Sequence, residues 1–197
     1  MILVIATHNR KKGVEMATIL GERFPHLEIR TLTDYPGAPE PDETGSTYAE
    51  NATIKAEAAA DLTGEWCVAD DAGLEIDYFD GAPGLYSKRF AGEGTTFPEK
   101  MAIVLREMAG VPEEKRGARF RCLVALAKKG EPTRLVEGIC EGRIATERRG
   151  EYGFGYDPIF WVPQKGCAMA ELPPEEKHKI SHRGMALSRL GDLIEGL

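Results

Sequence analysis

The chain has 197 residues, of which 42% are hydrophobic and 29% charged, and its formal net charge is −7. This length allows one domain with a sizeable core, or two lobes, and the composition is ordinary for a soluble globular protein. The acidic balance argues against a surface that coats nucleic acid, and no apolar run is long enough to span a membrane. The N-terminus shows no signal-peptide pattern. Four scattered cysteines without a Cys-x-x-Cys pair are expected to be buried thiols in a reducing cytoplasm.

Hydrophobic periodicity predicts strands and helices in alternation. Strand-like runs lie at 2–7, 27–32, 67–69, 74–77, 118–128, 134–147 and 158–162, and helix-like runs at 11–23, 47–62, 98–108 and 182–197. The stretch 36–45, rich in proline and acidic residues, predicts a loop, and 110–117 a charged connector. The order βαβαβ, then long strands, then a helix indicates an α/β fold with a mixed sheet, formed by a single domain over 1–197.

Three consecutive cations, Arg10, Lys11 and Lys12, open the first predicted helix. A helix N-terminus carries partial positive charge, so cations are disfavoured there unless an anion is bound. Thr7 and Asn9 add a hydroxyl and an amide beside them, and Asn9 also suits the N-cap. The segment 7–12 is therefore interpreted as a phosphate-binding segment. A solvated basic turn with an ordinary Asn cap is the alternative, and on this segment alone the two are about equally supported.

A buried strand is expected to end in a pair of carboxylates, Asp70 and Asp71, followed by a turn at Gly73. Ligands of α/β sheets bind at the carboxyl ends of strands, so the pair is a candidate for chemistry. Adjacent residues on extended chain point in opposite directions. We therefore expect one to face the site and the other to hold backbone or a cation. The alternative is an Asx-turn that closes the strand.

Acidic and basic residues around the second predicted helix suggest a metal and phosphate site. Thr47 and Glu50 fit a Thr-x-x-Glu capping box, which is the preferred interpretation of Glu50. Glu43 lies in the loop before the helix, and a loop Glu with the strand-end Asp71 would suit Mg²⁺, although such loop residues are usually just solvated. Lys55, on the same helix, could reach a phosphate or be an ordinary surface lysine.

Two further segments carry groups that could recognise a nucleotide. In 153–158, glycines flank Phe154, whose ring and that of Tyr156 could stack on a base, while an Asp could accept a hydrogen bond. The alternative is a tight turn with its aromatics in the core. Near the last helix, Ser181 is a plausible N-cap, and His182 and Arg183 again place donor groups at a helix start.

The ordered set of motifs resembles the inosine triphosphate pyrophosphatase family. It comprises 7–12, Glu43-Thr44-Gly45 with Glu50-Asn51-Ala52, 69–74, Pro83-Gly84-Leu85-Tyr86-Ser87, Ala118-Arg119-Phe120, 153–158, Ala170-Glu171-Leu172 and 181–183. The resemblance spans about residues 2–190, and each motif is weak alone while the ordered set is specific. It implies hydrolysis of ITP, dITP and XTP to the monophosphate and pyrophosphate with Mg²⁺. It also implies a cytoplasmic homodimer with an elongated mixed sheet flanked by helices, and two lobes around a central active-site cleft.

The resemblance also implies roles for individual residues. Asp71 would be the proton acceptor and a metal ligand, with Glu43 as the second metal ligand. Phe154 would stack on the base. The full set of expected substrate contacts is Thr7, His8, Asn9, Arg10, Lys11, Lys12, Lys55, Ala72, Phe154, Gly155, Tyr156, Asp157, Lys177, His182 and Arg183. Many family members carry Ser where this chain has Ala72, so only the backbone N–H could serve there.

Base choice follows in part from the residues that the resemblance places around the base. Arg183 or His182 could donate to the O6 acceptor of a 6-oxo purine, and Asp157 could accept from its N1–H. Adenine reverses both groups and would leave buried partners unpaired. The rejection of GTP is not explained by any residue of the sequence. A related pyrophosphatase acting on other modified bases, and a nucleotide sensor that binds without hydrolysis, are the alternatives.

Overall fold

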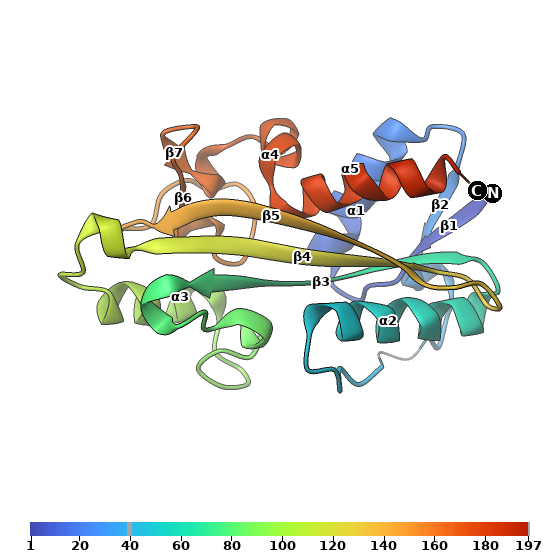
Figure 1. Ribbon diagram of the computed structural model, residues 1–197, viewed down its shortest axis with the longest axis horizontal. Coiled ribbons are helices and arrows are strands. Elements are labelled where there is room, and N and C mark those ends of the chain that lie inside the picture. The colour runs from blue at the N-terminus through green and yellow to red at the C-terminus, as the bar shows by residue number, and fades with distance from the viewer. Residues whose placement is uncertain (39–40, 197) are drawn as a thin grey trace. The chain divides into compact units, whose positions relative to one another are not determined.

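The computed structural model describes residues 1–38 and 41–196 and divides into two compact units (Figure 1). The first unit comprises 1–71, 122–138 and 182–197, and the second comprises 72–121 and 139–181. Seven strands form one mixed sheet in the order β2-β1-β3-β4-β5-β6-β7. The predicted α/β class with a mixed sheet is confirmed, while the single domain over 1–197 and the cleft stay predictions.

The first unit begins as the predicted βαβαβ arrangement. Strand β1 (Ile2–Ile5) runs parallel to β2 (Glu28–Thr31) on one side and to the start of β3 (Trp66–Ile76) on the other. The strands β4 (Gly117–Ala127) and β5 (Arg134–Ile144) contribute residues to both units, as β3 does. The first-unit part of β4, residues 122–127, is entirely apolar and mostly buried, which suits a strand covered by helices.

Helices form layers against the strands of the first unit. Helix α2 (Tyr48–Thr63) buries a stripe of alanines against β1, β3 and β4, and its small side chains bring the helix close to the sheet. Helices α1 (Arg10–Arg23) and α5 (His182–Ile194) contact each other, and Figure 1 shows them across the strands from α2. Each β3 residue of this unit therefore faces either α2 or the α1–α5 pair.

The second unit contains parts of β3, β4 and β5, the short strands β6 and β7, and two helices. Strand β5 pairs antiparallel with β6 (Phe160–Val162), which pairs antiparallel with β7 (Cys167–Ala168). Helix α3 (Phe97–Glu107) begins at a capping box, and α4 (Pro174–Ile180) begins with a proline. The buried Arg116 guanidinium donates to the carbonyls of Met108, Ile144 and Ala145, which ties the end of α3 to the end of β5.

Several predicted boundaries were wrong. The runs 67–69 and 74–77 form one continuous strand, so Asp70 and Asp71 lie inside β3 and the expected turn at Gly73 does not form. The predicted strand 134–147 ends at Ile144, and 158–162 begins as a 3₁₀ turn before β6. Helix α4 was missed because seven residues are too few to show helical periodicity.

The predictions for the 36–45 loop, the last helix and the cysteines agree with the structure where it is described. The described part of 36–45 is irregular, and residues 39 and 40 lie outside the described residues. The last helix ends at Ile194, and residue 197 of its predicted span is not described. All four cysteines are free, three of them buried and Cys167 partly so. Within the described ranges, no helix combines the length and apolar character needed to cross a membrane.

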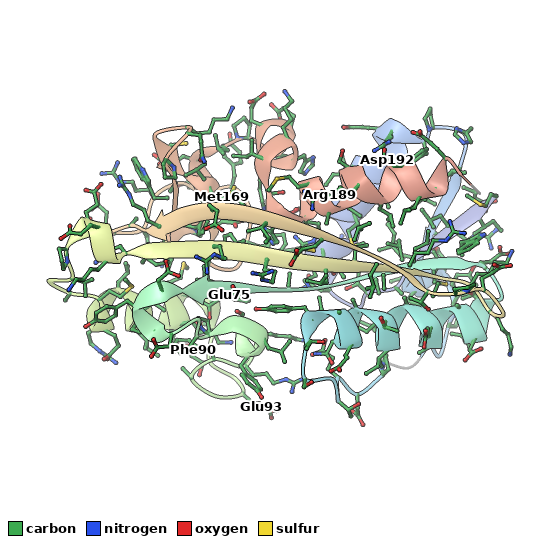
Figure 2. The ribbon with its side chains drawn as sticks, in the orientation of Figure 1. Glu75, Phe90, Glu93, Met169, Arg189 and Asp192 are labelled. Carbon is green, nitrogen blue, oxygen red and sulfur yellow. The ribbon has the colours of Figure 1, made fainter. Side chains whose placement is uncertain are left out.

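Helix α5 is fixed on β5 by a close backbone approach. A Cβ built at Gly138 would lie 2.0 Å from the His182 carbonyl oxygen and 2.5 Å from the Ala186 nitrogen. Further along, Arg189 donates to the Glu137 carbonyl oxygen at 2.6 Å, and Figure 2 labels Arg189 and Asp192 on this helix. Gly138 therefore sets where the first turn of α5 lies.

We expect Gly138→Ala to lower the free energy of unfolding by about 1–3 kcal/mol, because the added methyl forces backbone apart. The matched control is Gly21→Ala in α1, where the new Cβ lies 3.7 Å from Ile29 Cδ1 and alanine favours the helix by up to about 1 kcal/mol. Urea denaturation of both variants measures the difference. Equal stability of Gly138→Ala and the wild type would contradict the close approach.

Candidate active site

The two carboxylates of β3 lie on opposite faces of the sheet in the first unit. Asp71 faces α2, where it contacts Lys55 and Asn51. Asp70 faces the α1–α5 pair, where it contacts Lys12 and Arg183. The expectations that the neighbours point in opposite directions and that one of them holds a cation are confirmed. That the other faces the active site stays a prediction. The Asx-turn alternative is wrong because the strand continues through both residues.

On the α2 side, Asp71 is held by two residues that are one helical turn apart. Lys55 Nζ lies 3.2 Å from Asp71 Oδ1, and Asn51 Nδ2 lies 3.3 Å from Asp71 Oδ2. Burial raises the pKa of Asp71 above its usual range, with Lys55 and Lys12 opposing the shift. A carboxylate with a raised pKa in polar surroundings of this kind is suited to accept a proton.

Glu43 belongs to the same group of charges. Its Oε1 lies 3.1 Å from Lys55 Nζ, so a single ammonium lies between the carboxylates of Glu43 and Asp71. Burial lowers the pKa of Lys55, but Asp71, Asp70 and Glu43 outweigh this and raise it overall. Two carboxylates converging on one cation make a position that favours positive charge.

The loop that carries Glu43 is anchored to α2. The Gly45 N–H donates to Asn51 Oδ1 at 2.9 Å, and a Cβ at Gly45 would come within 2.6 Å of that oxygen. The predicted capping box of Thr47 and Glu50 is confirmed, with hydrogen bonds in both directions. The start of α2 therefore positions both the loop and Asp71.

On the opposite face, Asp70 accepts from two cations. Arg183 donates to Asp70 Oδ2 through Nη2 at 2.8 Å and Nε at 3.1 Å, and Lys12 Nζ lies 3.1 Å from the same oxygen. Arg183 Nη1 also donates to Glu15 on α1 at 3.2 Å. Burial would raise the pKa of Asp70, but Lys12, Arg183 and Lys55 hold it well below its usual range. Asp70 is a permanently charged anchor.

The predicted phosphate-binding segment is ordered by its own side chains. Asn9 caps α1 by accepting from the backbone N–H groups of Lys11 and Lys12 at 3.1 and 3.2 Å, and Thr7 Oγ1 accepts from the Asn9 N–H. The side chains of His8, Arg10 and Lys11 are exposed. An anion does neutralise Lys12 at this helix start, but it is the carboxylate of Asp70. Charge at the helix terminus therefore does not by itself require a phosphate.

Phe154, the aromatic residue predicted to stack on the base, lies in the second unit. Phe154 is half-buried in a turn where Asp157 Oδ2 accepts from the Phe154 N–H at 2.9 Å and from Lys177 Nζ at 2.8 Å. Lys177 Nζ also lies 4.6 Å from the centre of the Phe154 ring. This buried ion pair fixes the turn, and Gly153 is required there because a Cβ would lie 2.1 Å from Asp157 Oδ2.

Tyr156 has a structural part in the same turn. It is buried, its hydroxyl donates to the Ser87 carbonyl oxygen at 3.1 Å, and its ring meets Phe97 edge-on at 5.3 Å. Burial raises the pKa of the Tyr156 hydroxyl. Gly155 adopts a positive φ of 67° beside Phe97. These contacts match the core alternative for Tyr156, whereas Phe154 keeps a partly exposed ring.

Three of the predicted substrate contacts, His182, Arg183 and Ala72, lie at the start of α5 and within β3. Arg183 is 2% exposed and His182 6% exposed, both buried at the start of α5. Ala72 continues β3 immediately after Asp71 and is half-buried. Substrate contacts by these three residues stay predictions.

Sequence reasoning missed Asn51 and Glu15 as parts of the site. Asn51 had a usable signal, because it lies four residues before Lys55 on the same helix face and adjoins the buried alanines. Glu15 lies three residues after Lys12 on α1, next to the buried Met16. In each case a polar residue interrupts a buried stripe. Among the described residues, no group of three or more His, Cys, Asp or Glu side chains is assembled that could alone hold a metal ion.

The chain is similar to known proteins in both sequence and structure. Residues 3–193 match the Ham1 family. The dITP/XTP pyrophosphatase of Geobacillus kaustophilus is 50% identical over 193 residues, covering 98% of this chain and 94% of that protein. The Bacillus subtilis dITP/XTP pyrophosphatase is 48% identical, covering 98% and 96%. A HAM1 protein structure from Coxiella burnetii has a TM-score of 0.88 at 40% identity, with both chains fully covered. With sequence and fold in agreement over nearly its whole length, the chain belongs to the Ham1 family.

Proposed function

We propose that the protein hydrolyses deaminated purine nucleoside triphosphates, namely ITP, dITP and XTP, to the monophosphate and pyrophosphate. The observation that carries the proposal is the buried Asp71, held between Lys55 and Asn51 beside Glu43. Family membership and the similarity to proteins named dITP/XTP pyrophosphatases support it. The enzyme is further proposed to act as a cytoplasmic homodimer on this small-molecule substrate, as the family resemblance implies.

In this proposal Asp71 accepts the proton of a water that attacks the α-phosphorus. Lys12 and Lys55 exchange their carboxylate partners for phosphate oxygens, with Thr7, His8, Asn9, Arg10 and Lys11 completing the phosphate contacts. Positive charge at the departing pyrophosphate stabilises the transition state. The network in the first unit supports this assignment because both lysines are pre-positioned by carboxylates that remain beside them.

Glu43 and Asp71 would hold a Mg²⁺ ion. Their carboxylates already converge on one cation, the Lys55 ammonium, so a cationic position exists between oxygen ligands. Two carboxylates completed by water and phosphate oxygens are the ligand set that Mg²⁺ favours. The bound ion would neutralise the phosphates and polarise them for attack.

Residues of the 153–158 turn, the backbone of Ala72 and the start of α5 are proposed to act on the base. Phe154 stacks on the purine, and its ring is held by the Asp157–Lys177 pair. The turn residues Gly155 and Tyr156, the backbone of Ala72, and His182 and Arg183 complete the proposed contacts. A 6-oxo purine is favoured over adenine because donors and acceptors around O6 and N1–H would be unpaired with a 6-amino group.

The proposal predicts pyrophosphate release from dITP and XTP in preference to dGTP, dUTP and dATP, and loss of this activity in Asp71→Asn. Asn is nearly isosteric and cannot accept the proton, so kcat should fall by about 10²–10⁴-fold. The exposed Asp61→Asn on α2 is the control and should leave kcat unchanged. Binding of nucleotide without any pyrophosphate release by the wild type would favour the sensor alternative instead.

Turnover should depend on a hard metal ion that prefers oxygen ligands. Mg²⁺ should support turnover of dITP, Ca²⁺ should do so poorly, and excess EDTA should abolish it, because Mg²⁺ imposes tight octahedral geometry on the phosphates. Glu43→Gln should raise the Mg²⁺ concentration for half-maximal activity, whereas the neighbouring exposed Asp42→Asn should not. Full activity in excess EDTA would rule out this metal site.

Removing the Phe154 ring should weaken binding of every purine alike. Stacking is worth roughly 1–3 kcal/mol per base, so Phe154→Ala should raise KM for dITP and for dATP by similar factors of about 5–150. Tyr152→Ala, an exposed aromatic in the same segment, serves as the control. Steady-state kinetics decide the question, and an unchanged KM in Phe154→Ala would remove this residue from the proposed base site.

A further inference from the structure

We propose that Asn51 is a positioning residue that holds the proton acceptor Asp71 and the metal-binding loop in register; this inference rests on the proposed function. The side chain is 3% exposed and uses both ends of its amide. Nδ2 donates to Asp71 Oδ2 at 3.3 Å, and Oδ1 accepts from the Gly45 N–H at 2.9 Å. One side chain therefore links β3, α2 and the 43–45 loop.

Asn51 and Lys55 each connect α2 to both Asp71 and the 43–45 loop, and these two connections are called the amide bridge and the ammonium bridge. Asn51 and Lys55 are one helical turn apart, each contacts one oxygen of Asp71, and each reaches the loop, Asn51 at Gly45 and Lys55 at Glu43. Residues four apart on a helix face the same way, which is why one face of α2 supplies both bridges. The amide bridge carries no net charge, whereas the ammonium bridge does.

This difference gives Asn51 its role when substrate is bound. Phosphate oxygens and a divalent ion both compete for the contacts of Lys55, because they offer it an anion and its carboxylates a cation. A neutral amide is not drawn to phosphate in this way. Asn51 therefore keeps Asp71 and the loop in place after Lys55 has turned to the substrate.

The close fit at Gly45 supports a positional role. A Cβ there would lie 2.6 Å from Asn51 Oδ1 and 2.6 Å from Glu50 Cβ, so the loop backbone lies directly on the helix at this point. Glu43 is two residues before Gly45, and its carboxylate is carried by that backbone. A shift of the loop would separate the two proposed metal ligands.

The test is Asn51→Ala, which removes both hydrogen bonds. With dITP, kcat should fall by about tenfold or more while KM stays within about threefold, because the phosphate and base contacts are untouched. Mn²⁺ binding without nucleotide, measured by electron paramagnetic resonance, should weaken by about tenfold for the same reason. A rise in KM with unchanged kcat, or wild-type kcat and Mn²⁺ affinity, would overturn the proposal.

The matched control is Glu57→Ala, on the exposed side of the same helix α2. Glu57 Oε1 accepts from Thr133 Oγ1 at 2.5 Å and has no part in the contacts of Asp71 or of the 43–45 loop described above, so its loss removes one tertiary contact of α2 alone. Its melting temperature should fall while kcat and Mn²⁺ affinity stay at wild-type values. If Glu57→Ala lowered kcat as much as Asn51→Ala, the effect would be general destabilisation and the proposal would fail.

A second variant covers the case in which Asn51→Ala does not fold. Asn51→Leu has nearly the same volume and keeps the helix, but it can neither donate to Asp71 nor accept from the Gly45 N–H. It should stay folded, as judged by circular dichroism, and lose kcat without a change in KM; full activity would reject the positioning role. If the wild type released no pyrophosphate from dITP, the proposed function would fail, and the Mn²⁺ measurement on Asn51→Ala would still decide the positioning role.

Discussion

The first unit depends on one buried ion pair, between Asp70 on β3 and Arg183 on α5. The side chains are 1% and 2% exposed, and the guanidinium is shared with Glu15 of α1. Charges are costly to bury, and removing one partner of such a pair typically costs about 3–5 kcal/mol because the other is left unpaired. The pair therefore joins a strand and two helices in a way that tolerates no substitution of a single partner.

The alternation of side chains along β3 then determines the chemistry. One residue beyond Asp70, Asp71 faces α2 and meets a lysine and an amide instead of an arginine. The same residue type consequently has its pKa lowered at position 70 and raised at position 71. A structural anion and a candidate base can be adjacent in sequence because successive side chains of a strand point in opposite directions and meet different hydrogen-bond partners. Cys122, which contacts Asp70, has its thiol pKa raised by burial and by that charge, so it remains a neutral packing residue.

In the second unit, another buried ion pair, between Asp157 and Lys177, stabilises the structure around the candidate site. Asp157 and Lys177 are each 4% exposed at the side chain, and together they hold the turn that presents Phe154. Arg183 and Asp157 were expected from the sequence to donate to and accept from the base. Their observed contacts show that both first stabilise the protein around the residues that would meet the substrate. Lys12 follows the same pattern, since its ammonium is paired with Asp70.

Local sequence patterns were sufficient to predict much of the fold and part of the candidate site. The alternating apolar runs predicted the βαβαβ order, Asn9 and Thr47 marked the starts of α1 and α2, and the Asp70-Asp71 pair was recognised as having two different roles. These features depend on residues close together in the chain, whose spacing alone determines which face they occupy. The ordered motifs were also sufficient to indicate the family.

Tertiary structure decided which charges are neighbours. The partners of Asp70 are 58 and 113 residues away, and no local pattern relates them. The strand continues through Asp70 and Asp71 because those distant cations compensate the buried carboxylates, which is why the predicted turn at Gly73 was wrong. Asn51 and Glu15 were missed because a polar residue in an apolar stripe is explained only by the group it meets. In this protein the sequence determined the elements and their faces, and packing determined which carboxylate is a structural anchor and which is the candidate base.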